Sequence, residues 1–69
     1  MAALFDVVRV LEDLPLQRVK KGMTGAVVDV YEVPTRAYEV EFVDGEGRTI
    51  QVATLSEYQF EIVLPSPIK

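Results

Sequence analysis

The sequence predicts a small all-β domain built from short strands. Apolar and polar residues alternate with a period of two in five separate runs, and turn-forming residues lie between these runs. The clearest run begins at Tyr38, where Tyr38, Val40 and Phe42 alternate with Glu39 and Glu41. The chain has 69 residues, 49% of them hydrophobic, which is enough for one domain with a core of its own.

The first run covers residues 6–12, where Val8 and Val10 share one face. Residues 2–14 could also be read as a helix, because Leu4, Val8 and Leu11 stand near helical spacing. We favour a strand, since β-branched valines are restricted about χ1 and fit a pleated surface. Residues 14–24 then form a long loop before the second strand.

Four further strands are expected, and the spacing of apolar residues assigns each an inner face. They cover residues 25–33, 37–44, 48–55 and 60–65. The predicted core is Val8, Val10, Val28, Val30, Tyr38, Val40, Phe42, Ile50, Val52, Phe60 and Ile62, with Leu55 closing one end.

Short turns connect these strands. Pro34 presets the backbone for a turn over residues 34–36. Gly45 and Gly47 suit a tight hairpin over residues 44–47, because glycine adopts positive φ without a steric penalty. The segment from Ser56 to Gln59 has room for one helical turn, which we expect to be a 3₁₀ turn.

Five strands with a long first loop, a central hairpin and one 3₁₀ turn before the last strand predict a five-stranded SH3-like barrel. Rolling the sheet into a barrel leaves few exposed strand edges for so short a chain. We expect the barrel to span residues 1–64 and residues 65–69 to form a loose C-terminal tail.

The composition argues against most kinds of catalytic chemistry. The chain has no Cys and no His, so it lacks thiolate ligands, disulfides and the usual general base. Glu39 and Glu41 point the same way on one strand, without the shielded cleft that an acid–base pair needs. We therefore expect no catalytic residue, no metal site and no cofactor.

The N-terminal segment carries charges that interrupt the apolar core of a signal peptide, and no apolar run is long enough to span a membrane. We expect a cytoplasmic protein that does not enter the membrane. The net charge is −4 and the pI is about 4.6. This acidity disfavours nucleic acid as a ligand and favours a basic protein partner.

An acidic face is the leading candidate for a binding site. Glu39 and Glu41 share one face of their strand, and the neighbouring strand adds Asp29, with Tyr31 as an aromatic anchor. Such a face would attract a basic protein. The alternative is an ordinary solvated exterior, where acidic residues keep exposed strands from pairing.

A basic loop is the second candidate. Arg18, Lys20 and Lys21 precede two glycines, Gly22 and Gly25, and could contact phosphates of a nucleic acid. This stretch resembles the KOW motif of transcription-elongation and ribosomal proteins, and the SH3-like domains of the nitrile hydratase β-subunit kind. The positions that match the KOW motif are Gly22, Gly25, Val27 and Val30.

The structural alternative is that Gly22 and Gly25 let the second strand leave the loop and bend around the barrel. Three cations would release only about three counterions, too few for tight binding by a chain with 11 acidic residues. The apolar residues opposite the predicted core could form an oligomer face. They are Val7, Leu11, Val27, Val43, Ala53 and Val63.

Three longer segments resemble a family of small uncharacterised bacterial proteins, known as a domain of unknown function of about 60–90 residues. They are DVVRVLEDLP at 6–15, KKGMTGAVVDVY at 20–31 and YEVEFVDGEGRT at 38–49. The resemblance implies a stand-alone SH3-like barrel without a known activity. Members of such families often lie beside suspected toxin genes, which implies an antitoxin-like role.

The sequence therefore predicts a non-enzymatic protein-interaction module, either antitoxin-like or a small subunit of a bacterial complex. The alternative is an RNA- or ribosome-associated KOW-like domain that acts through Arg18, Lys20 and Lys21.

Overall fold

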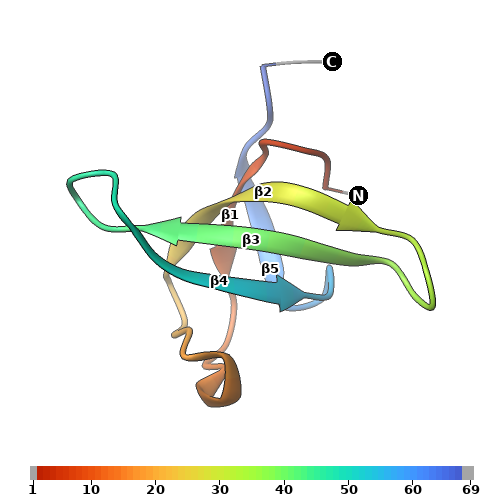
Figure 1. Cartoon of the computed structure of the whole chain (residues 1–69), viewed down its shortest axis with the longest axis horizontal. Coiled ribbons are helices and arrows are strands. Elements are labelled where there is room, and N and C mark those ends of the chain that lie inside the picture. The colour runs from red at the N-terminus through yellow and green to blue at the C-terminus, as the bar shows by residue number, and fades with distance from the viewer. Residues whose placement is uncertain (1, 68–69) are drawn as a thin grey trace.

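The computed structural model describes residues 2–67 and consists of one five-stranded antiparallel sheet with the strand order β4-β3-β2-β1-β5 (Figure 1). The strands are β1 (Val7–Val10), β2 (Thr24–Tyr31), β3 (Ala37–Val43), β4 (Thr49–Leu55) and β5 (Phe60–Leu64). Each lies within or close to one of the five predicted runs, so the all-β prediction is confirmed.

The sheet is strongly coiled. In Figure 1, β2, β3 and β4 run across the front, while β1 and β5 pass behind them at a steep angle. Within the described residues β4 pairs only with β3, and β5 only with β1. The fold is therefore the predicted SH3-like barrel in an open form, with β4 and β5 as its two edges.

The first loop contains a 3₁₀ helix, η1 (Pro15–Gln17). Its first residue is proline, which lacks an N–H group, and this costs no hydrogen bond because the first N–H groups of a helix have no partner within the helix. Leu14 and Val19 form an isolated antiparallel bridge that closes the loop behind η1, and Val19 is buried in the core. The 3₁₀ turn was expected at residues 56–59. That segment is a turn closed by a 3.0 Å bond from the Gln59 N–H to the Ser56 carbonyl, and the described 3₁₀ helix is η1.

The core lies between the two layers of the coiled sheet. Tyr38 and Phe60 meet edge to face at its centre, with ring centroids 5.4 Å apart. Buried hydrophobic residues are Ala2, Val8, Val10, Val19, Val27, Tyr38, Val40, Phe42, Ala53, Leu55 and Phe60. Leu55 is buried as expected, whereas four predicted core residues, on β2, β4 and β5, are exposed.

A β-bulge in β2 explains the first error. Val27 lies opposite Val40, and Asp29 lies opposite Glu39, so Val28 is an extra residue on β2. The bulge shifts the alternation by one residue. Val27 is therefore buried and Val28 exposed, the reverse of the prediction.

The pairing of β4 with β3 explains the second error. Thr49 lies opposite Val43 and Gln51 opposite Phe42, which makes Ile50 the extra residue. After this irregularity Ala53 and Leu55 point inward, beside Val40 and Tyr38. Ile50 and Val52 are exposed, so their assignment to the core was wrong.

Ile62 lies on the same side of the sheet as its neighbour Val8, as predicted, but it is exposed. It belongs to an edge strand, and no described strand covers it from the open side. Its assignment to the core was also wrong, because the barrel is not closed.

A buried carboxylate joins the two ends of the described chain. Asp6 accepts a 2.9 Å hydrogen bond from the Ala3 N–H and a 2.6 Å bond from the Ser66 N–H. Both Asp6 and Ser66 are buried. The chain after β5 is thus fastened beside the start of β1 at Ser66, whereas residues 68–69 of the expected tail lie outside the described residues.

Candidate functional site

The structure brings Asp29, Tyr31 and Glu39 together on the outer face of β2 and β3. Asp29 lies directly opposite Glu39, on the side of the sheet that faces away from Val27 and Val40. Tyr31 follows on the same face of β2. Desolvation, and then the carboxylates of Glu39 and Asp29, raise the pKa of the Tyr31 phenol. Asp29 and Tyr31 share a face because they are two residues apart, and the bulge at Val28 turns this face outward although Val27 points inward.

Glu41 extends the site along β3. It lies two residues after Glu39 and is opposite Ala26 on β2 and Val52 on β4. We call the set Asp29, Tyr31, Glu39 and Glu41 the acidic face.

Each carboxylate of the acidic face accepts a hydrogen bond from an uncharged donor. The Thr54 hydroxyl donates to Glu39 Oε1 at 2.8 Å, and the Thr49 hydroxyl donates to Glu41 Oε2 at 2.6 Å. The Val30 N–H donates to Asp29 Oδ1 at 2.8 Å. These bonds hold the carboxylates in place and leave their negative charge uncompensated.

The ion pairs of the described residues lie elsewhere. They are Arg9–Glu61, Arg36–Glu32, Arg48–Asp44 and Arg48–Glu46. No ion pair in the described part of the chain involves Asp29, Glu39 or Glu41. The acidic face is therefore a local concentration of unneutralised negative charge.

A shallow depression of about 200 Å³ adjoins the acidic face at Glu41. Its lining is mainly apolar and is drawn from the outer sides of β1, β2 and β3. The lining residues are Val7, Thr24, Gly25, Ala26, Glu41 and Val43. The outer sheet thus offers aliphatic surface next to carboxylates.

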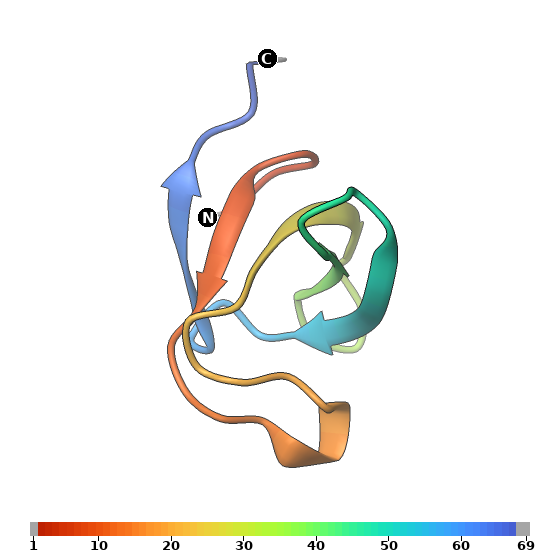
Figure 2. The ribbon, with the colours of Figure 1, turned by 90° about the vertical axis from the view of Figure 1, so that its left-hand side faces the viewer.

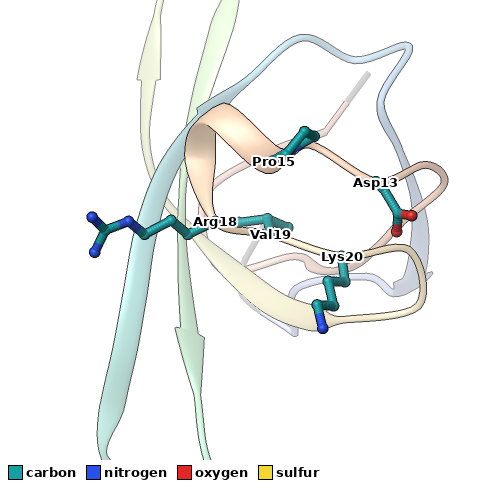
Figure 3. A pocket seen from close by; sticks show the side chains of 5 residues that line it. All are labelled: Asp13, Pro15, Arg18, Val19 and Lys20. Atoms are coloured by element: carbon teal, nitrogen blue, oxygen red, sulfur yellow. The ribbon is translucent and has the colours of Figure 1, made fainter.

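The basic loop has a different geometry. A depression of about 450 Å³ is lined by Asp13, Pro15, Arg18, Val19 and Lys20 (Figure 3). The Arg18 side chain extends away from Lys20 and Asp13, out past the neighbouring strand (Figure 3). The Asp13 carboxylate accepts a 2.9 Å hydrogen bond from the Lys21 N–H. The three cations therefore do not converge on one surface, and an acid lies among them.

The four predicted structural glycines differ in what requires glycine at each position. A Cβ on Gly25 would lie 2.6 Å from the Glu41 carbonyl oxygen and 2.9 Å from Phe42, so only glycine allows β2 and β3 to approach so closely. Gly22 and Gly47 have φ of +91° and +81°. Gly45 has neither a positive φ nor a close neighbour.

Sequence reasoning missed the residues that hold the site and its surroundings. Thr49 and Thr54 orient the acidic face, yet nothing in the alternation of β4 marks them as partners of glutamates on β3. Gln17 contacts β4 across 37 residues of sequence, because its side-chain oxygen accepts a hydrogen bond from the Thr54 N–H.

Among the described residues no group of three or more His, Cys, Asp or Glu side chains could hold a metal ion. No helix in that part of the chain is long and apolar enough to cross a membrane.

The chain was compared with known protein families, curated proteins and solved structures. A family model described as a domain of unknown function, DUF4926, matches residues 4–62. The chain belongs to the DUF4926 family. No curated protein and no solved structure matches it. Membership confirms the resemblance to an uncharacterised domain family. It does not assign a function to the chain.

Proposed function

We propose that this DUF4926 chain is a non-enzymatic protein-interaction module that binds a basic protein through the acidic face. In the cytoplasm of a bacterium, this role would be that of an antitoxin-like inhibitor or a small subunit of a larger complex. One observation carries the proposal. Asp29, Glu39 and Glu41 gather on one outer surface, and no described cation pairs with them.

Electrostatics makes this surface attractive to a cation. Carboxylates on adjacent strands repel one another, and like charges directly opposite, as at Asp29 and Glu39, destabilise a sheet. An arriving lysine or arginine would relieve that repulsion. Tyr31 adds an aromatic ring beside the carboxylates, which can contribute a cation–π contact of about 0.5–1 kcal/mol.

The apolar depression at Glu41 supports a protein partner over a simple ion. Val7, Ala26 and Val43 supply aliphatic surface within the same outer sheet. A partner segment that alternates basic and aliphatic residues could place its cations on the acidic face and an aliphatic side chain in this depression. Burial of apolar surface would then add to affinity that charge alone supplies weakly.

The test is a titration of the ¹⁵N-labelled protein with a synthetic peptide of alternating lysine and valine, followed by NMR. We expect amide shifts to concentrate on β2 and β3 around Asp29, Tyr31, Glu39 and Glu41. The double variant Asp29→Asn, Glu39→Gln should weaken binding at least about tenfold, since it removes both opposed charges.

A matched control separates this site from overall acidity. The double variant Glu12→Gln, Glu57→Gln removes the same net charge from exposed positions outside the acidic face. If both double variants weaken the peptide equally, the affinity reflects net charge alone and the acidic face is not a site.

Binding to heparin tests the other route. We expect the chain to pass through a heparin column at low salt. Retention that the double variant Lys20→Glu, Lys21→Glu abolishes would contradict the proposal and favour an RNA-binding loop.

A further inference from the structure

The apolar depression beside Glu41 follows the outer side of β2, which passes between β1 and β3 (Figure 2). Val7 on β1 and Glu41 on β3 both lie opposite Ala26, one on each side of it. Neighbouring strands are about 4.8 Å apart, so the backbones at Val7 and Glu41 are separated by about 10 Å. The depression exists because β2 carries a small residue where both of its neighbours carry larger ones.

Most of the border of this depression is uncharged. Val7 and Ala26 are half-buried, and Val43 is 45% exposed. Arg9 lies opposite Thr24, at the next outward position of β2, but the Arg9 guanidinium is 3.0 Å from Glu61 and is neutralised by it. Charge therefore enters the border of the depression without compensation only at Glu41.

The Glu41 carboxylate is half-buried, and no ion pair among residues 2–67 involves it. The Thr49 hydroxyl donates to its Oε2 at 2.6 Å and leaves the negative charge in place. A neutral side chain that covered the depression would remove water from this carboxylate and return nothing, which is unfavourable. An occupant that fits both parts of the depression has an apolar body and a positive end.

We propose that the depression binds one lysine side chain of a basic protein, with the methylene stem on Val7, Ala26 and Val43 and the ammonium group on Glu41. The inference rests on the proposed function and names the side chain that is recognised. Lysine buries its stem along apolar surface while its charged end keeps polar contacts. The stem supplies the aliphatic contact, and the ammonium group supplies the missing counter-charge, in a chain whose net charge is −4.

The hydrogen bonding of Glu41 selects lysine over arginine. The depression has a volume of about 200 Å³, which is room for one long side chain. A guanidinium group binds a carboxylate best through both of its oxygens, but the Thr49 hydroxyl already donates to Oε2. An ammonium group needs a single oxygen, and Oε1 provides it.

The length of the stem is the property to test. The ¹⁵N,¹³C-labelled protein is titrated at about pH 6 with a peptide of alternating lysine and valine, and with the same peptide carrying 2,4-diaminobutyrate at every lysine. Both peptides have the same charge at this pH, but the second has two methylenes fewer in each cationic side chain. A fully buried methylene contributes about fourfold in affinity. Because the open depression leaves the stem partly exposed, we expect the shorter peptide to bind about fivefold more weakly.

Intermolecular NOEs identify the occupant directly. We expect NOEs from lysine methylene protons of the peptide to the methyl groups of Val7 and Val43. NOEs to these methyl groups from the valines of the peptide alone would overturn the lysine assignment. An arginine–valine peptide that binds more tightly than the lysine–valine peptide would overturn it as well.

Two variants on β2 connect the stem to the depression. Ala26→Leu fills it, so the lysine and diaminobutyrate peptides should bind this variant equally. Val28→Leu enlarges an exposed side chain on the same strand outside the depression and should keep the fivefold difference. Amide spectra show whether each variant is folded. A fivefold difference that survives in a folded Ala26→Leu chain contradicts the proposal.

The charge of Glu41 is tested separately. Glu41→Gln should weaken the lysine peptide at least threefold more than Glu57→Gln does, because Glu57 is an exposed acid outside the depression. Equal effects of the two substitutions contradict the proposal.

The outcomes also separate this inference from the proposed function. Equal affinity of the parent chain for both peptides, with amide shifts on β2 and β3, overturns the lysine site and leaves the acidic face standing. A chain that binds neither peptide overturns the proposed function, and the lysine site with it.

Discussion

The strands β4 and β5 are both outer strands of one sheet, yet they are held in different ways. The edge of β4 is covered by a residue from a distant loop, because Gln17 accepts a bond from the Thr54 N–H. Among residues 2–67 nothing covers the edge of β5, and the strand is secured beyond its end, where Asp6 accepts a bond from the Ser66 N–H. One edge is blocked and the other is anchored but open.

This difference shows that edge protection need not lie in the edge strand itself. Both strands are rich in exposed aliphatic residues, among them Ile50 and Val52 on β4 and Ile62 and Val63 on β5. The residues of each strand, taken separately, therefore do not show which of the two edges is protected. Hydrogen bonding by the first loop makes β4 a poor template for pairing, and no described residue gives the edge of β5 the same protection.

The largest loss of stability is expected from a substitution at Gly25, where β2 and β3 lie too close together for a Cβ. Gly25→Ala would place a Cβ 2.6 Å from the Glu41 carbonyl oxygen and force β2 away from β3. We expect a loss of about 3 kcal/mol in the free energy of unfolding, a large share of the total for so small a domain. Urea unfolding measures this. Gly45→Ala, with no close neighbour, is the control and should be near neutral.

A smaller loss of stability is expected at Asp6, whose carboxylate anchors the chain beyond β5. Asp6→Ala removes the acceptor of the buried Ser66 N–H and of the partly buried Ala3 N–H. We expect a loss of about 2 kcal/mol, because both donors lose this acceptor, one of them in a buried position. Asp6→Asn keeps one acceptor oxygen and should lose less. An Asp6→Ala chain as stable as the parent would show that β5 does not depend on this anchor.

A still smaller loss of stability is expected from a substitution at Gln17, whose side chain bonds the outer edge of β4. Gln17→Ala removes the acceptor of the Thr54 N–H and should lower the free energy of unfolding by about 1 kcal/mol. The more specific result is faster hydrogen exchange of the Thr54 amide, with little change on β5. Leu16→Ala, at the fully exposed neighbouring position, is the control. Unchanged exchange at Thr54 would mean that Gln17 does not protect this edge.

The smallest change in stability is expected at Asp44, in the hairpin that joins β3 to β4. Backbone hydrogen bonds from Arg48 and Glu46 to Asp44 lower the pKa of the Asp44 carboxyl below its ordinary value of 3.8. Because the folded pKa is lowered, this stabilisation is present above the unfolded pKa and is lost as the pH falls through the folded pKa.

We therefore expect Asp44→Asn to be slightly less stable than the parent at neutral pH, with the difference vanishing in acid. Urea unfolding at several pH values measures it. A difference that persists in strong acid would show that the Asp44 charge is not its source.

The sequence predicted the positions of the strands more accurately than it predicted which face of each strand is buried. Tyr38, Val40 and Phe42 on β3 were assigned correctly because β3 alternates clearly and its only irregularity falls at its last residue. On β2 and β4 both faces carry aliphatic residues, so alternation alone does not decide which one is buried.

The candidate site was predictable in part. Asp29, Tyr31 and Glu39 were expected on adjoining strands, and the register places them together. The partners of the glutamates, Thr49 and Thr54, were not expected. Their role follows from the pairing of β3 with β4, which is a non-local property.

Local sequence patterns are sufficient to specify the five strands, the turns between them and the burial of one face of β3, because period-two alternation and turn residues act over a few residues. Tertiary structure alone decided the inner faces of β2 and β4, through bulges at Val28 and Ile50 that shift the alternation by one residue. It also decided which edge is blocked, because Gln17 and Thr54 meet only when the first loop folds onto the sheet.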